Sequence, residues 1–191
     1  MQNLKTICVY CGSGVGTDPV YKAIALELSD YLVDNHMQLV NGGGSIGLMG
    51  VMADRILEKG GKCIGVIPHG LKEKEVAHLG MTELIVTPDM HTRKRTMVDR
   101  SDAFIAIPGG FGTLDELFET LTWAQLNLHN KPIGLLNVSG YFDPLIDMAN
   151  RMVKEGFLRA DGRALLRTSD NIEDLFAILN KSGSAHSLKW T

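Results

Sequence analysis

The chain of 191 residues has few cysteines, few prolines and no excess of basic charge. Three cysteines, an odd number, do not make a disulfide framework, which favours a reducing compartment and a cytoplasmic protein. Six prolines and a hydrophobic fraction of 45% are typical of an ordinary globular protein. The formal net charge of −3 argues against nucleic acid as a partner, because nucleic-acid surfaces usually carry a basic excess.

Long uncharged runs are absent as well. No stretch approaches the length of a membrane span, so we expect no membrane partner. Residues 1–5 lead directly into an apolar run, without the hydrophobic segment of a secretory signal. The length favours a single domain over residues 1–180, followed by a loose tail at residues 181–191.

Metal ligands and redox pairs are poorly represented. Cys8 and Cys11 form a C-x-x-C pattern, but Cys8 falls within an apolar run, and no second Cys or His pair has a metal-binding spacing. The six histidines are dispersed, and no lysine has a context that suggests a Schiff base. The sequence therefore predicts neither a metal site nor a cofactor.

Strand-like and helix-like segments alternate along the chain. The apolar runs predict strands at residues 6–10, 38–41, 63–67, 84–86, 103–107 and 133–137. Helical periodicity predicts helices at residues 19–35, 47–59, 89–101, 114–121, 142–155 and 172–179. This alternation predicts an α/β fold with a parallel sheet that helices cover on both faces.

Glycine-containing loops follow three of these strands, at residues 12–16, 42–47 and 109–112. The carboxyl ends of parallel strands meet at one edge of a sheet, where ligands of such folds bind. Glycine lets a ligand approach the backbone closely, and helix N-termini bind anions, most often phosphate. The three loops therefore predict one phosphate-bearing ligand.

The stretch PGGFGTLDE at residues 108–116 carries the strongest functional signal. Its glycines lie at a turn between a strand and a helix, and Thr113 is placed to cap that helix or to bond a phosphate oxygen. Glu116 stands one turn into the helix, beside the predicted anion site. A phosphate cradle alone needs no acid, so Glu116 indicates chemistry or hydroxyl binding next to the phosphate.

A basic segment, MHTRKR at residues 90–95, precedes the strand that leads to these glycines. Arg93 can reach the same edge of the sheet, where it would bind phosphate or pair with Glu116. Glu119 stands three residues after Glu116 and so shares its helix face. Glu119 is equally compatible with a solvated acid in the first turns of the helix.

Other nucleotide-binding motifs fit poorly. Residues 42–47, GGGSIG, match the dinucleotide pattern G-x-G-x-x-G, but the following strand ends without the acid that would hold a ribose. No Gly-Lys-Ser/Thr follows the glycines, so a Walker A loop is also disfavoured. A mononucleotide is a better ligand than NAD.

The stretch at residues 108–116 matches the PGGxGTxxE signature of the LONELY GUY (LOG) family, and the chain resembles that family over residues 5–179. The family comprises cytokinin riboside 5′-monophosphate phosphoribohydrolases, often mislabelled lysine decarboxylases. The other matching segments are Cys11-Gly12-Ser13, GGGSIGLMG at 42–50, DMHTRK at 89–94, TWAQL at 122–126 and KPIGLLN at 131–137.

The resemblance implies a Rossmann-like, doubly wound homodimer that hydrolyses an adenosine-type nucleoside 5′-monophosphate, cytokinin riboside 5′-monophosphate or AMP. The products are free base and ribose 5-phosphate. Arg93 and Glu116 correspond to the catalytic residues. The substrate-binding residues that the resemblance indicates are Gly12, Ser13, Gly43, Gly44, Ser45, Met90, Lys94, Pro108, Gly109, Gly110, Phe111, Gly112, Thr113 and Glu119.

Two positions depart from the family pattern: Gly14, where relatives often carry serine, and Phe111, where tyrosine is frequent. The alternative function is a non-catalytic carrier, because related Rossmann-like proteins bind a nucleotide or molybdenum cofactor at a similar turn without cleaving it. Arg93 and Glu116 together discriminate, since a carrier needs neither. The sequence leaves the preferred base open.

Overall fold

The computed structural model describes residues 4–72 and 77–181. Its strands are β1 (Thr6–Tyr10), β2 (Gln38–Asn41), β3 (Cys63–Pro68), β4 (Glu83–Thr87), β5 (Ala103–Ala106), β6 (Ile133–Leu136) and β7 (Leu166–Ser169). They form one parallel sheet in the order β4-β3-β2-β1-β5-β6-β7. The direction of winding reverses between β1 and β5, which is where such sheets bind ligands at their carboxyl edge. The predicted doubly wound α/β fold is thus confirmed.

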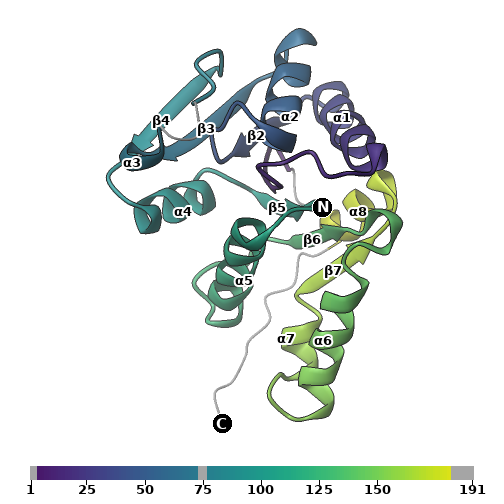
Figure 1. Cartoon of the computed structure of the whole chain (residues 1–191). Helices are drawn as coiled ribbons and strands as arrows, with labels where there is room; N and C mark the ends of the chain where they lie inside the picture. Colours follow the sequence, from purple (N-terminus) through teal and green to yellow (C-terminus); the bar gives the residue numbers. More distant parts are fainter. Residues whose placement is uncertain (1–3, 73–76, 182–191) are drawn as a thin grey trace.

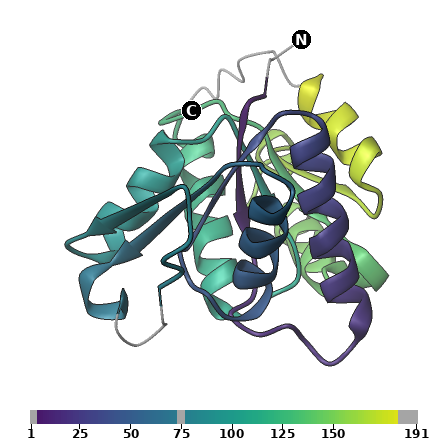
Figure 2. The same ribbon diagram turned by 90° about the horizontal axis from the view of Figure 1, so that it is seen from above.

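Helices join the strands and cover both faces of the sheet (Figures 1 and 2). They are α1 (Pro19–Asp34), α2 (Gly47–Glu58), α3 (His69–Lys72), α4 (Met90–Asp99), α5 (Phe111–Gln125), α6 (Asp143–Lys154), α7 (Ala160–Arg163) and α8 (Ile172–Asn180), with a 3₁₀ turn, η1 (Val138–Gly140). Apolar residues of α1, α2 and α8 pack on one face, and those of α4 and α5 pack on the other.

The central strand β1 explains why its sequence is an unbroken apolar run. Successive side chains of a strand point to opposite faces. Ile7 and Val9 therefore pack with α1 and α2, whereas Cys8 and Tyr10 pack with α4 and α5. All four are at most 2% exposed. A strand that is buried on both faces needs apolar residues at every position.

Side-chain caps fix where two of the helices begin. Asp18 accepts a hydrogen bond from the backbone N–H of Val20 at 2.9 Å, and Pro19 occupies the first position of α1. Asp89 accepts one from the N–H of Thr92 at 2.7 Å and so begins α4. Arg93 follows one turn later, on the side of α4 that faces the sheet and is buried.

Helix α5 begins three residues earlier than its apolar periodicity indicates. Gly110 is the N-cap, so Phe111, Gly112 and Thr113 form the first turn. The expectation that Thr113 caps the helix is therefore wrong. Apolar spacing does not reveal this first turn, because its glycine and threonine carry no apolar signal.

Four elements were not predicted: the one-turn helices α3 and α7, the 3₁₀ turn η1 and the edge strand β7. Strand β7, with the sequence LRTS, is half-buried and pairs on one side only, with β6. Three polar residues follow Leu166 in this strand, so the sequence contains no apolar run that would mark it as a strand. Of the predicted tail, Lys181 is the C-cap of α8, and residues 182–191 lie outside the described residues. Within residues 4–72 and 77–181, no helix is both long and apolar enough to cross a membrane.

Candidate functional site

Backbone hydrogen bonds join the glycine loops at the carboxyl edge of the sheet. The N–H of Gly12, after β1, donates to the carbonyl of Pro108, after β5, at 3.1 Å. The N–H of Leu48, at the start of α2, donates to the carbonyl of Gly12 at 3.0 Å. The structure thus brings the three predicted loops together, across the switch point between β1 and β5.

Close packing of these loops explains two of the glycines. A Cβ on Gly109 would lie 2.1 Å from Oγ1 of Thr113 and 2.7 Å from the backbone N of Gly12. Gly47 has a φ of +65°, and a Cβ there would lie 2.2 Å from the carbonyl carbon of Ser13. Both positions need glycine for the contact between loops, whether or not a ligand is bound.

The N-terminus of α5 is open. A Cβ on Gly110 or on Gly112 would meet nothing within 4 Å, and the side chain of Phe111 is 93% exposed. The first backbone N–H groups of a helix have no partner within the helix, and they lie at the positive end of its dipole. An anion can therefore approach α5 at Gly110–Gly112, next to the buried Thr113.

Arg93 and Glu116 form a buried ion pair beside this helix terminus. Nη1 of Arg93 lies 2.8 Å from Oε1 of Glu116, and the two residues are only 7% and 8% exposed. Nε of Arg93 donates to the backbone carbonyl of Val66 at 2.9 Å. The guanidinium is thus held between β3 and α5. The structure brings together the two residues that the sequence analysis placed in catalysis.

Burial raises the pKa of Glu116 above its ordinary value, because an apolar environment disfavours the carboxylate, while the nearby Arg93 guanidinium opposes that rise. A carboxyl group whose pKa lies above the ordinary glutamate range is suited to accept a proton close to neutral pH.

Two hydroxyl groups form a hydrogen-bonded chain that ends at the backbone carbonyl of Glu116. The hydroxyl of Thr120 donates to the backbone carbonyl of Glu116 at 2.8 Å, and the hydroxyl of Tyr10 lies 2.8 Å from Oγ1 of Thr120. Both residues are buried. Sequence analysis missed them, because nothing in the chain indicates that β1 passes directly beneath this part of α5.

Lys94 lies beside the same helix but pairs with other acids. Its Nζ is 3.0 Å from Oε2 of Glu119 and 3.1 Å from Oδ2 of Asp115. Burial alone would lower the pKa of Lys94, but these two carboxylates outweigh it and raise the pKa. Glu119 is therefore a partner of Lys94 rather than a solvated acid. A lysine held protonated in this way is a poor Schiff-base nucleophile.

The loop after β2 is held by the side chain of Asn41 and by backbone pairing with the segment at Ala77. Gly43 has a φ of +77°, and its N–H donates to Oδ1 of the buried Asn41 at 2.9 Å. Gly44 forms an antiparallel bridge with Ala77. Ser45 is half-buried, and Met90 is partly exposed at the start of α4. Gly43 is thus explained by backbone conformation, without a contact to a ligand.

A hollow of about 310 Å³ lies next to the loop at residues 108–110. It is bordered by residues 12–16 and by Tyr21, Leu48 and Tyr141, and the Tyr141 hydroxyl donates to the Gly109 carbonyl at 2.6 Å. Among the described residues that line it, neither member of the Arg93–Glu116 pair is found. The predicted substrate residues Gly12, Ser13, Pro108, Gly109 and Gly110 thus face this hollow.

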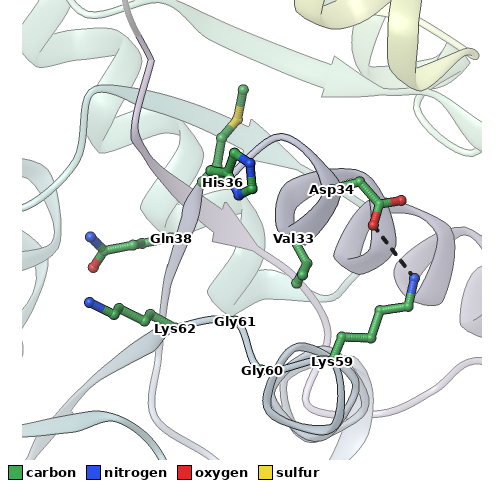
Figure 3. Close-up of a pocket in the computed structure, with 9 residues that line it drawn as sticks. Val33, Asp34, His36, Gln38, Lys59, Gly60, Gly61 and Lys62 are labelled. Atoms are coloured by element: carbon green, nitrogen blue, oxygen red, sulfur yellow. Dashed lines mark ion pairs between the residues drawn. The ribbon is translucent and has the colours of Figure 1, made fainter.

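A larger hollow, of about 630 Å³, lies at the opposite end of the sheet (Figure 3). It is lined where α1 and α2 end and where β2 and β3 begin, and Figure 3 shows Lys59 paired with Asp34 on its rim, 3.8 Å apart. The carboxyl ends of two helices present partial negative charge, which disfavours a phosphate. This hollow is remote from the glycine loops and from Glu116.

The cysteines do not support redox chemistry. Cys8, Cys11 and Cys63 are free and buried, and burial raises the pKa of each thiol. A buried thiol that resists ionisation is unreactive. In the part of the chain that the structure describes, no group of three or more His, Cys, Asp or Glu side chains could hold a metal ion.

The chain is similar to known proteins in sequence and in fold. Residues 49–179 match the family described as "Possible lysine decarboxylase". A cytokinin riboside 5′-monophosphate phosphoribohydrolase of Arabidopsis thaliana is 46% identical over 171 residues, which cover 90% of this chain and 80% of the relative. A probable enzyme of the same description from Oryza sativa subsp. japonica is 43% identical, over 94% of this chain and 81% of the relative.

Solved structures with the same fold are more distant in sequence. The molybdenum cofactor binding protein of Rippkaea orientalis superposes with a TM-score of 0.69 at 23% identity, over 95% of this chain and 98% of that chain. The Moco carrier protein of Chlamydomonas reinhardtii gives a TM-score of 0.68 at 20% identity, over 93% and 96%. At such identities the likeness establishes the fold alone. The family match and the relatives at 43% and 46% identity decide the family: the chain belongs to the LOG family.

Proposed function

We propose that this protein hydrolyses the N-glycosidic bond of an adenosine-type nucleoside 5′-monophosphate and releases the free base and ribose 5-phosphate. The observation that carries the proposal is the buried Arg93–Glu116 pair beside the open N-terminus of α5. The names of the relatives support this reaction and the substrate class of cytokinin riboside 5′-monophosphates.

The phosphate binds at the N-terminus of α5. The N–H groups of Phe111, Gly112 and Thr113 supply hydrogen bonds, and the helix dipole favours negative charge. The phosphate does not react, so its binding energy serves to position the sugar against Glu116. The loops with Gly12, Ser13 and residues 43–45 close around the nucleotide, with Met90, Lys94 and Glu119 at its border.

Glu116 acts on the sugar. As the bond between the anomeric carbon and the base nitrogen breaks, its electron pair leaves with the base, and the sugar becomes an oxocarbenium-like cation that the carboxylate stabilises. A water molecule bonds to the anomeric carbon, and Glu116 takes its proton. The proton that Glu116 takes passes through solvent to the departing nitrogen, which restores the carboxylate. Arg93 holds the carboxylate in place through Nη1.

A carrier without activity has less support. Binding a phosphorylated ligand requires the helix terminus and the glycine loops, but it does not require a buried carboxylate with a raised pKa next to the ligand. The likeness to carriers of molybdenum cofactor extends to the fold alone.

The substitution Glu116→Gln tests the reaction. It keeps the size of the side chain and removes the proton acceptor, so we expect release of adenine from AMP to fall at least about 100-fold, with AMP binding retained. Glu58→Gln is the matched control, because Glu58 is exposed at the far end of α2 and should leave the rate unchanged.

Free base is measured by chromatography after incubation with AMP, isopentenyladenosine monophosphate and adenosine. The phosphate-dependent reading predicts poor turnover of adenosine. Undiminished base release by the Glu116→Gln variant would remove Glu116 from catalysis. Tight binding of every monophosphate without any release would establish a carrier instead.

We also infer a cytoplasmic homodimer that has no nucleic-acid partner. Support for the dimer comes from Phe111 and Phe118, which stand seven residues apart on one face of α5 and are 93% and 40% exposed beside the site. Free, buried cysteines and a net charge of −3 support the other two statements. Light scattering coupled to gel filtration measures the mass, and a monomer at micromolar concentration would contradict the dimer.

A further inference from the structure

We propose that Gly42 is a positioning residue for Arg93: the missing side chain at position 42 forms the slot that holds one end of the guanidinium group. A Cβ on Gly42 would lie 2.1 Å from Nη2 of Arg93 and 3.3 Å from its Cζ. Separations below 3.0 Å essentially never occur for a real Cβ. The guanidinium group of Arg93, from α4, therefore occupies the space that a side chain at position 42 would need, and only glycine leaves that space free.

The three nitrogens of the Arg93 guanidinium meet three different elements. Nε donates to the carbonyl of Val66 in β3, and Nη1 pairs with Glu116 in α5. Nη2 lies over Gly42, directly after β2. Because the guanidinium is planar and rigid, a push on Nη2 displaces Nη1 and Nε as well. An alanine at position 42 would therefore break or lengthen the contact with Glu116.

The slot cannot widen easily. The same Cβ on Gly42 would lie 2.9 Å from Sδ of Met49, on the other side of the loop. The fully buried Asn41 ties this loop together, since its Nδ2 donates to the Met49 carbonyl at 3.2 Å and its Oδ1 accepts from the Gly43 N–H at 2.9 Å. The backbone around Gly42 is thus fixed, and the strain falls on Arg93.

Backbone conformation does not explain this glycine. Gly43 and Gly47 have φ values of +77° and +65°, which favour glycine, whereas Gly42 has no positive φ. An alanine at position 42 is therefore compatible with the backbone conformation, and the nearest atoms that its Cβ would meet belong to the side chains of Arg93 and Met49. The first glycine of the loop thus makes room for the guanidinium group of Arg93.

This inference rests on the proposed function, in which Glu116 is the catalytic carboxylate. If Arg93 is displaced, Glu116 loses the positive charge that opposes the effect of burial, and its pKa rises further. The position of Arg93 can thus be read from the titration of Glu116, independently of turnover.

The test is the substitution Gly42→Ala, with the Glu116 carboxyl titrated by ¹³C NMR and kcat and KM for AMP measured against pH. We expect the Glu116 pKa to rise by about one unit or more, because an opposite charge at contact distance commonly shifts a pKa by 1–3 units. We expect kcat to fall about 10- to 100-fold, with its acid limb moved to higher pH.

Gly134→Ala is the matched control. Gly134 lies within the buried strand β6, and a Cβ there would likewise collide with a side chain, at 2.8 Å from Cδ1 of Leu175 in the core against α8. Its variant should lose stability and leave both the Glu116 pKa and kcat of the folded protein unchanged. An equal rise in the Glu116 pKa in Gly42→Ala and Gly134→Ala would contradict the positioning role, because the rise would then come from a general loss of packing.

A second comparison uses Arg93→Lys, which keeps the positive charge and has no atom equivalent to Nη2. Adding Gly42→Ala to this variant should leave the Glu116 pKa unchanged and folding nearly so, because the collision with Nη2 no longer exists and only the 2.9 Å contact with Sδ of Met49, at the end of a flexible side chain, remains. The comparison remains informative if Gly42→Ala alone does not fold, because the double variant Arg93→Lys/Gly42→Ala should fold. A double variant that also fails to fold would overturn the proposal.

The outcomes distinguish the positioning role of Gly42 from the proposed catalytic role of Glu116. An unchanged Glu116 pKa in Gly42→Ala contradicts the positioning role, whatever happens to turnover. A raised Glu116 pKa with unchanged kcat supports the positioning role and contradicts catalysis by Glu116.

Discussion

Replacing Arg93 with methionine should destabilise the protein by an amount that depends on pH. Methionine fills a similar volume but leaves Glu116, which is 8% exposed, without its partner at 2.8 Å. Removing one partner of a buried ion pair typically costs about 3–5 kcal/mol, because the other charge remains buried. The protein can avoid that cost by protonating Glu116.

The free energy needed to keep Glu116 protonated sets the size of the destabilisation. Each pH unit above the ordinary glutamate pKa of 4.5 costs about 1.36 kcal/mol for a carboxyl group that must stay protonated. The cost is therefore about 4 kcal/mol at pH 7.5 and under about 1 kcal/mol at pH 5. Loss of the hydrogen bond from Nε to the Val66 carbonyl adds about 1–3 kcal/mol at either pH.

The direction with pH follows from linkage. In the folded variant Glu116 binds its proton more tightly than in the unfolded chain, so the folded state is favoured most below pH 4.5. That contribution is lost as the pH rises through the window between the ordinary value and the raised value of the variant. The stability difference between the wild type and the variant should therefore be about 1–4 kcal/mol at pH 5, and larger by up to about 3 kcal/mol at pH 7.5.

Urea unfolding at pH 5 and at pH 7.5 measures both free energies. The double variant Arg93→Met/Glu116→Gln is the control, since it has no carboxyl group left to protonate, and its loss relative to the wild type should be no larger at pH 7.5 than at pH 5. An equal loss at both pH values for Arg93→Met, or a loss that is still larger at pH 7.5 in the double variant, would refute the assignment of the effect to Glu116.

Two further predictions concern the loops and the thiols. Gly109→Ala should lower the free energy of unfolding by about 1–3 kcal/mol and abolish AMP binding, because its Cβ would lie 2.1 Å from Oγ1 of Thr113 and displace the loop from α5. Calorimetry measures the binding, and unchanged AMP affinity would contradict this packing. Cys8, Cys11 and Cys63 should resist iodoacetamide at pH 8 in the folded protein and react in urea, as mass spectrometry can show, and fast labelling of Cys8 or Cys11 in the native state would contradict their burial and raised pKa.

The order of strands and helices could be predicted because local patterns determine it. Strands buried on both faces appear as unbroken apolar runs, as in β1 and β5, and the glycine loops after them mark the edge where ligands bind. Strand β7 escaped prediction because an edge strand that is half-exposed needs no apolar run. The start of α5 was placed too late because glycine and threonine carry no periodicity.

Sequence analysis named the residues of the candidate site, but it could not give their arrangement. Arg93 and Glu116 were recognisable from their motifs, and sequence analysis left open whether the arginine binds phosphate or pairs with the acid. The structure places Nη1 at 2.8 Å from the carboxylate, and it assigns Glu119 to Lys94. Such choices depend on distances between α4 and α5, which no local pattern contains.

By itself, therefore, the sequence determined the fold class and the edge of the sheet where the glycine loops gather, and it pointed to Arg93 and Glu116, because apolar periodicity and glycine turns act over a few neighbouring residues. Only the tertiary structure decided which charges meet, how deeply Glu116 is buried and why position 42 is a glycine. These properties arise where β2, β3, α4 and α5 pack against one another, and the burial that raises the Glu116 pKa exists only in the packed chain.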